Sequence, residues 1–154
     1  MSEPAAKFTR HHTKDKGDLG VARVIADLMT AGIQVSLPIS EHLPFDLIAI
    51  APDHRLSKLS VKFLTMTARG TVIIPGRSGW TDRHGVHKRP HKVGDYDAVA
   101  VYCPTTNRCY YVPAVELARQ DTTLRILETR NSQKLGVRMA ECFTDPFQVF
   151  PEPP

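Results

Sequence analysis

The stretch PFDLIAIAPDHRLSKLSVKFL, residues 44–64, carries the pattern from which the fold can be predicted. Residues 46–51 (DLIAIA) form a short apolar run that is typical of a buried strand. Residues 52–55 (PDHR) have the composition of a turn, and residues 57–65 (SKLSVKFLT) follow as a second strand. Because the connection is short, we expect the two strands to pair as an antiparallel hairpin.

The flanking segments predict one helix and several further strands. Residues 17–31 have apolar side chains at helical spacing, and Gly32 follows as a C-terminal stop. The apolar positions are Val21, Val24, Ile25, Leu28 and Met29. Further strands are expected at 33–37, 71–75, 97–103, 109–112 and 124–127, with a turn at 105–108 and a short helix near 114–119. This order predicts an α/β (α+β) domain with a mixed β-sheet flanked by helices.

Length and composition fit one globular domain with short tails. The chain has 154 residues, of which 42% are hydrophobic and 23% are charged. No apolar run approaches the roughly 20 residues that span a bilayer, so no membrane partner is expected. Three cysteines without a CxxC pattern argue against a disulfide scaffold or a cysteine zinc site, and predict a reducing, cytoplasmic setting.

Basic residues gather in two segments, and the net charge of +4 permits a polyanionic partner. We expect residues 1–12 to be a flexible basic arm, 76–94 a long basic loop inside the domain 13–143, and 144–154 a loose proline-rich tail. Trp80 is placed to stack on a base or to wedge into a groove, although a merely solvated loop is the alternative. The candidate phosphate-binding residues are Lys14, Lys16, Arg77, Arg83, Lys88, Arg89 and Lys92.

Asp46, Ser60 and Lys62 form the candidate catalytic group. Ser60 and Lys62 are two residues apart on one strand, so their side chains share a face, and strand pairing would bring Asp46 beside them. A carboxylate can hold a hard divalent cation, and a lysine can orient water or stabilise the negative charge that develops on a phosphate. Taken alone, these residue types are also common surface features of strands.

The segments KGDLGVARVIADLMTAGIQVSLPISEHLPFDLIAI and LSVKFL resemble the PD-(D/E)xK nuclease superfamily. The chain is most similar to the small endonucleases found in group I introns and as stand-alone prokaryotic genes. The segments GDYDAVAVYCPTTNRCYYVPAVEL and LRILETRNSQKLGVRMAECF extend the resemblance to roughly residues 13–143. It implies a restriction-endonuclease-like core and a homing-type or repair/resolvase-type DNA endonuclease. It also implies Mg²⁺ (or Mn²⁺) as cofactor, double-stranded DNA as substrate, and a homodimer or homotetramer.

Carried over by position, the resemblance makes Asp46 the metal-binding aspartate and Lys62 the catalytic lysine. Ser60 stands where the family has Glu, Asp or Gln, and Val21 stands where it tends to have a helical Glu. Asp18, one turn before Val21, is a candidate replacement ligand, or else a carboxylate favoured by the helix dipole. Glu41 is a further candidate. The two substitutions leave open a catalytically degenerate DNA-binding protein on the same fold, and a domain without a nucleic-acid role is the third reading.

Overall fold

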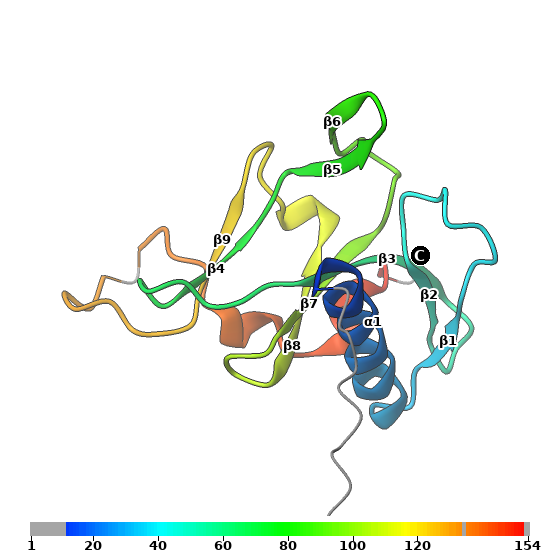
Figure 1. Ribbon diagram of the computed structural model, residues 1–154. Helices are drawn as coiled ribbons and strands as arrows, with labels where there is room; N and C mark the ends of the chain where they lie inside the picture. Colours follow the sequence, from blue (N-terminus) through cyan, green and yellow to red (C-terminus); the bar gives the residue numbers. More distant parts are fainter. Residues whose placement is uncertain (1–11, 134, 153–154) are drawn as a thin grey trace, which may run out of the picture.

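The computed structural model describes residues 12–133 and 135–152, apart from the side chains of Trp80 and Thr81. Its centre is a mixed five-stranded sheet with one long helix, α1 (His12–Thr30), packed on one face (Figure 1). The strand order is β1 (Gln34–Ser36), β2 (Leu47–Ile50), β3 (Leu56–Phe63), β7 (Ala98–Cys103) and β8 (Arg108–Pro113). The predicted fold class, an α/β (α+β) domain with a mixed β-sheet flanked by helices, is confirmed, with one α-helix among the described residues.

Pairing within the sheet follows the sequence pattern. The β2 and β3 strands form the expected antiparallel hairpin, and β7 pairs antiparallel with β8 as the second expected hairpin. The β3 and β7 strands run parallel, so the chain between them must cross over outside the sheet. That crossover contains β4 (Thr71–Ile74), β5 (Arg77–Asp82) and β6 (Gly85–Pro90).

Two small sheets and several 3₁₀-helices complete the architecture of the described residues. The β4 strand pairs with β9 (Thr122–Arg125) in a two-stranded sheet beside the central one. The β5 and β6 strands form a separate hairpin that projects from the body of the molecule (Figure 1). The part of the chain that the structure describes also contains three 3₁₀-helices after β8: η1 (Ala114–Glu116), η2 (Ala140–Phe143) and η3 (Pro146–Val149). No described helix is long and apolar enough to cross a lipid bilayer.

The helix ends where the sequence predicts but begins earlier. At its C-terminus Gly32 has a positive φ of 82°, and Ile33 N–H donates to the carbonyl of Leu28 at 3.0 Å, as in a Schellman motif. At the other end the helix begins at His12, five residues before the predicted start at 17. Met29, expected on the apolar face, is 55% exposed. Residues 13–16 are polar and exposed, so the apolar spacing could not reveal this first turn.

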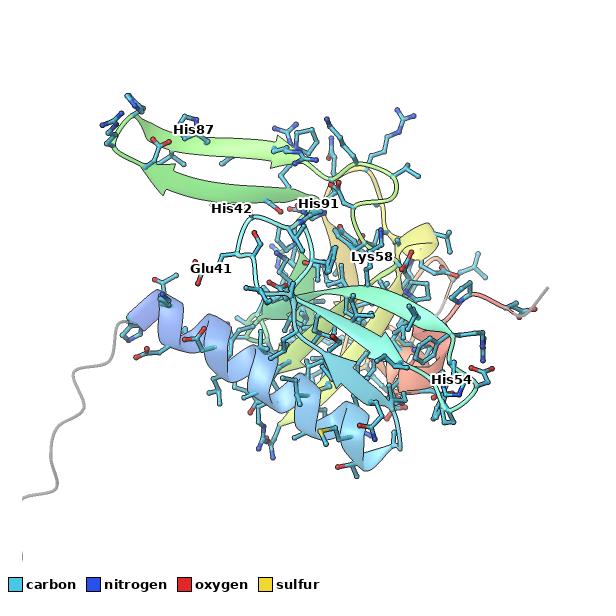
Figure 2. The ribbon with its side chains drawn as sticks, turned by 90° about the vertical axis from the view of Figure 1, so that its right-hand side faces the viewer. Glu41, His42, His54, Lys58, His87 and His91 are labelled. Carbon is cyan, nitrogen blue, oxygen red and sulfur yellow. The ribbon has the colours of Figure 1, made fainter. Side chains whose placement is uncertain are left out.

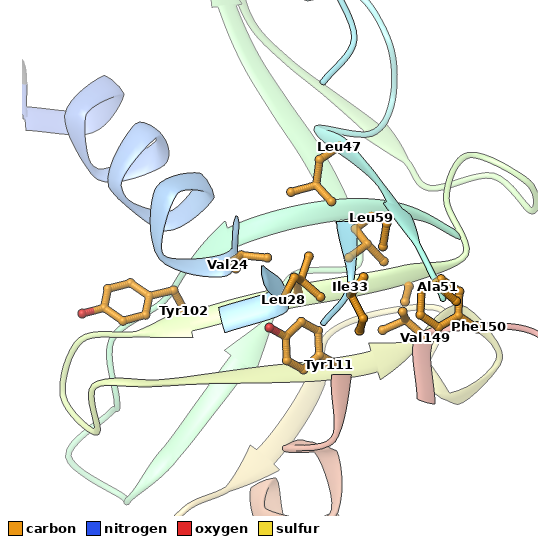
Figure 3. Close-up of a cluster of buried hydrophobic side chains, with 13 residues drawn as sticks. Val24, Leu28, Ile33, Leu47, Ala51, Leu59, Tyr102, Tyr111, Val149 and Phe150 are labelled. Atoms are coloured by element: carbon orange, nitrogen blue, oxygen red, sulfur yellow. The ribbon is translucent and has the colours of Figure 1, made fainter. Parts of the chain in front are cut away.

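The central strand β7 is buried along its whole length because both faces of the sheet are covered. One core lies under α1 and includes Val24, Leu28, Leu59 and Tyr111 (Figure 3). The second core, on the opposite face, joins Val99 and Val101 to β4 and β9. This two-sided burial explains the continuous apolar sequence of β7, which contrasts with the alternation of a half-buried strand.

Two predictions for irregular segments are wrong. The expected basic loop 76–94 contains the regular β5–β6 hairpin, in which Arg77 pairs with Pro90 and Asp82 with Gly85. The expected loose tail contains η3, and Val149 and Phe150 are 3% and 6% exposed in the core under α1. The predicted arm 1–12 lies outside the described residues except for His12.

Candidate active site

The start of β2 brings Asp46 opposite Ser60, as expected. Leu47 pairs with Leu59, so the next pair outward is Asp46 and Ser60. The Asp46 backbone N–H donates to the Leu59 carbonyl at 2.9 Å, and the Val61 N–H donates to Asp46 Oδ2 at 2.6 Å. The second carboxylate oxygen, Oδ1, has no hydrogen-bond partner among the described residues. Asp46 is therefore held in place through one oxygen while the other stays available.

Alternation along β3 sets the direction of the other two predicted residues. Leu59, Val61 and Phe63 pack in the core under α1. Ser60 and Lys62 therefore point to the opposite face of the sheet. The helix lies close to β3 here, since a Cβ built at Gly20 would be 3.4 Å from Phe63 Cβ. The helix side of β3 is therefore closed, whereas on the other face Ser60, itself only 4% exposed, and Lys62 line a cavity.

Asp46, Ser60 and Lys62 line one cavity of about 550 Å³. The loop before β2 supplies Glu41 and His42, and the hairpin supplies Ser78 and Arg89. Figure 2 shows His42 on this loop beside His91 at the base of the hairpin. The structure thus brings together the three residues that the sequence singled out, and it places them between a loop and a basic hairpin.

Lys62 is half-buried in this cavity. In the described part of the chain no carboxylate lies within ion-pair distance of its ammonium group. A second lysine on the same face, Lys58, is already engaged, because its Nζ donates to the Gly94 carbonyl at 2.6 Å. Of the two strand lysines, Lys62 is therefore the one whose charge is not committed to a described partner.

The sequence did not assign His91 and Tyr96 to the catalytic group, but both line the cavity. The Tyr96 hydroxyl bonds to His91 Nδ1, and His91 Nε2 lies 2.8 Å from Ser78 Oγ. Burial and the nearby Lys62 ammonium lower the pKa of His91 below its usual 6.5. Burial and the Asp95 charge raise the pKa of Tyr96 to about 12. Only the fold reveals these contacts, because His91 and Tyr96 follow the hairpin without a recognisable motif.

The predicted DNA-binding residues lie in three places. Lys14 and Lys16 are exposed in the first turns of α1. Arg77 and Lys88 belong to paired strands of the hairpin, Arg83 lies in its turn, and all three are exposed. Trp80 lies in β5, but its side chain is outside the described part of the structure.

The other two basic candidates lie near the base of the hairpin. Arg89 forms an ion pair with Asp95, with Nη2 3.2 Å from Oδ1. Lys92 is exposed, and its backbone N–H donates to Asp95 Oδ2 at 2.9 Å. Both residues are therefore tied to Asp95, Arg89 through its charge and Lys92 through its backbone.

The donor set determines what kind of metal site is possible. No cluster of three His, Cys, Asp or Glu suited to a metal ion occurs among the described residues. Asp18 is exposed on α1 and does not line the cavity, and Val21 packs against the core. Glu41 lines the cavity but does not form a three-ligand cluster with Asp46 and any described residue, so Asp46 and the Ser60 hydroxyl fit a magnesium site that keeps several waters and takes oxygens from the substrate phosphate. They do not fit an all-protein cage.

A mixed sheet with an acid and a lysine on paired strands is the arrangement of a nuclease-type fold. The profile of the PD-(D/E)XK endonuclease family matches residues 11–146. The chain belongs to this endonuclease family. No curated protein sequence matches it.

The solved structure entitled "The structure of a bacterial homing endonuclease: I-Ssp6803I" is similar to the chain, with a TM-score of 0.68 and 20% sequence identity. The match covers 90% of this chain and 92% of that chain. At this identity the likeness shows the fold. It extends over nearly the whole of both chains, so the central sheet, α1 and their surroundings belong to one common architecture.

Proposed function

We propose that the protein is a metal-dependent endonuclease that hydrolyses phosphodiester bonds in double-stranded DNA. The observation that carries the proposal is the convergence of Asp46, Ser60 and Lys62 on one open cavity beside a basic hairpin. Membership of the PD-(D/E)XK endonuclease family supports it. We place the enzyme in the cytoplasm, where its three free cysteines stay reduced.

Asp46 and Ser60 are the residues that would hold Mg²⁺ (or Mn²⁺). A bound divalent ion would offset the charge of the phosphate and lower the pKa of a coordinated water. Asp46 would contribute its free carboxylate oxygen, Oδ1, because its other oxygen, Oδ2, accepts a hydrogen bond from the Val61 N–H. Ser60 contributes a hydroxyl on the same face, which can also orient a water.

Lys62 supplies the positive charge of the site. In the hydrolysis of a phosphodiester, negative charge grows on the non-bridging oxygens and on the leaving oxygen. An ammonium group held close to these atoms stabilises the transition state more than the ground state. Lys62 suits this role because it is half-buried, lines the same cavity as Asp46, and has no carboxylate partner among the described residues.

The β5–β6 hairpin is the proposed DNA-binding element. A two-stranded ribbon fits the major groove of B-DNA, and the exposed Arg77, Arg83 and Lys88 can contact phosphates or base edges. The exposed Lys14 and Lys16 on α1 add phosphate contacts. A homodimer or homotetramer would bring two such sites to the two antiparallel strands of the duplex.

Cleavage of plasmid and branched DNA with Mg²⁺ or Mn²⁺ tests the proposal. Wild-type protein should nick or linearise DNA, whereas Asp46→Asn and Lys62→Ala should not. Arg130→Ser, which removes one exposed charge elsewhere, is the matched control and should cut like wild type. If Lys62→Ala cleaves as fast as wild type, the assignment of the site is wrong.

The alternative function is a DNA-binding protein on a degenerate nuclease fold. One observation favours it: Ser60 and Val21 occupy the positions at which the resemblance predicts further metal ligands. This alternative predicts salt-sensitive duplex binding without cleavage in any divalent ion. Calorimetric titration of Mn²⁺ separates the two, because only an active site should give a heat of binding that Asp46→Asn abolishes.

A further inference from the structure

The base of the hairpin contains a chain of three hydrogen-bonding side chains that the proposed mechanism has not used. Tyr96 is 6% exposed, and its hydroxyl bonds to His91 Nδ1. His91 Nε2 in turn lies 2.8 Å from the hydroxyl of Ser78, which is exposed. The chain thus runs from the buried Tyr96 to the cavity that holds Asp46 and Lys62.

The direction of each hydrogen bond follows from the inventory of donors. Tyr96 keeps its proton because its pKa is about 12, and His91 Nδ1 is the only described partner for that proton. A buried hydroxyl donates to the one acceptor that it has. Nδ1 therefore accepts, and a neutral imidazole then carries its proton on Nε2. The lowered pKa of His91 keeps the ring neutral near pH 7.

With its proton on Nε2, His91 donates to Ser78 Oγ, so the Ser78 hydroxyl proton is free for another acceptor. Ser78 lines the cavity together with Lys62 and pairs across the hairpin with Arg89. Cations and a hydroxyl donor around one hollow are groups that bind a phosphate oxygen. The Asp95 carboxylate, which is ion-paired with Arg89, reduces the net positive charge around this cavity.

We propose that Ser78, oriented by His91 and Tyr96, is a phosphate-binding residue of the active-site cavity, and that His91 is its positioning residue. The ligand is a phosphodiester oxygen of the DNA that the cavity acts on, so the inference rests on the proposed function. The hydroxyl fixes the strand at the base of the hairpin, next to Asp46, Ser60 and Lys62.

The first test is the tautomer of His91. Nitrogen NMR of ¹⁵N-histidine-labelled protein near pH 7, with His91→Gln to assign the signal, should show a neutral ring protonated at Nε2. A ring protonated at Nδ1 would overturn the proposal, because the Ser78 hydroxyl would then have to donate its hydrogen bond to His91 Nε2 and could not donate to a phosphate.

The second test is a double-mutant cycle with Ser78→Ala and His91→Phe. Each variant should weaken duplex binding, or slow single-turnover cleavage, by about tenfold, the expected effect of one hydrogen bond to a charged group. The double variant should be no worse than either single variant, because the residues act as a unit. Ser78→Thr keeps the hydroxyl and should restore wild-type behaviour. Additive losses, or wild-type binding and cleavage by Ser78→Ala, contradict the proposal.

The two proposals fail in different ways. If wild type cuts DNA and Ser78→Ala binds and cuts equally well, the Ser78 site is wrong while the nuclease stands. If wild type does not cut but Ser78→Ala and His91→Phe both lose duplex affinity without metal, the nuclease is wrong while the phosphate site stands. Thermal unfolding of His91→Phe checks that its loss does not come from unfolding.

Discussion

Introducing a carboxylate at residue 60 should convert the weak donor set into a stronger metal site. Ser60 lies directly opposite Asp46, and such cross-strand partners have Cβ atoms about 4.5–5.5 Å apart. Ser60 is only 4% exposed, but it lines the cavity of about 550 Å³, which offers room for the longer Glu side chain. Ser60→Glu therefore places a second carboxylate within reach of an ion bound to Asp46.

The size of the effect follows from Coulomb's law. Two unit charges about 4 Å apart interact by about 4 kcal/mol at an effective dielectric constant of about 20. Asp46 is exposed, so solvent reduces both the attraction to the ion and the repulsion between the two carboxylates. We expect a net gain of about 1.4–2.8 kcal/mol, which corresponds to ten- to hundredfold tighter binding of Mn²⁺.

Calorimetric titration of Mn²⁺ into wild type, Ser60→Glu and Ser60→Gln measures this gain. Ser60→Gln has the same shape without the charge and is the matched control. The metal-free Ser60→Glu protein should be less stable than Ser60→Gln, and Mn²⁺ should raise its Tm more. Equal Mn²⁺ affinities for the Glu and Gln variants would refute the placement of a metal beside Asp46.

Three further predictions concern the core, the hairpin and pH. Phe150→Ala should lower the free energy of unfolding by about 3–5 kcal/mol in urea titrations, because Phe150 is 6% exposed in the core; a change below about 1 kcal/mol would contradict its packing. Replacing both Arg77 and Lys88 by Ser should weaken duplex binding and reduce the slope of log K against log salt by about 0.9 for each lost phosphate contact. A slope equal to that of Arg130→Ser would show that the hairpin does not contact the DNA phosphates. The folded protein resists protonation of His91, whereas the unfolded chain binds the proton near pH 6.5, so wild-type stability should fall as pH decreases through 6.5. His91→Gln should flatten this part of the Tm–pH curve, and parallel curves would contradict the contribution of His91.

The helix could be predicted because its apolar residues are periodic, and the sheet because its strands are short apolar or alternating segments bounded by turns. Alternation placed Ser60 and Lys62 on one face, and the short turn predicted the pairing that brings Asp46 to them. The β5–β6 hairpin was missed because its described side chains are polar or exposed on both faces, so no hydrophobic alternation marks it. The tail was wrongly predicted to be loose because its prolines are typical of irregular structure, although Phe147, Val149 and Phe150 are apolar.

The remaining site residues depend on contacts that one sequence does not encode locally. His91 and Ser78 are 13 residues apart, and their hydrogen bond exists only because the hairpin folds back on itself. Lys62 is 29 residues before His91, yet its charge lowers the pKa of His91 because the crossover returns to β3. Such relations follow from tertiary structure, which spacing and composition do not reveal.

The most direct measurement is single-turnover cleavage of duplex DNA in Mg²⁺ or Mn²⁺ by wild type, Asp46→Asn and Lys62→Ala, with duplex binding measured on the same samples. We predict that wild type cuts and that both variants bind DNA without cutting it. Cleavage by Lys62→Ala at the wild-type rate, or bound wild-type complexes that leave the DNA intact, would contradict the assignment of this cavity as a nuclease active site.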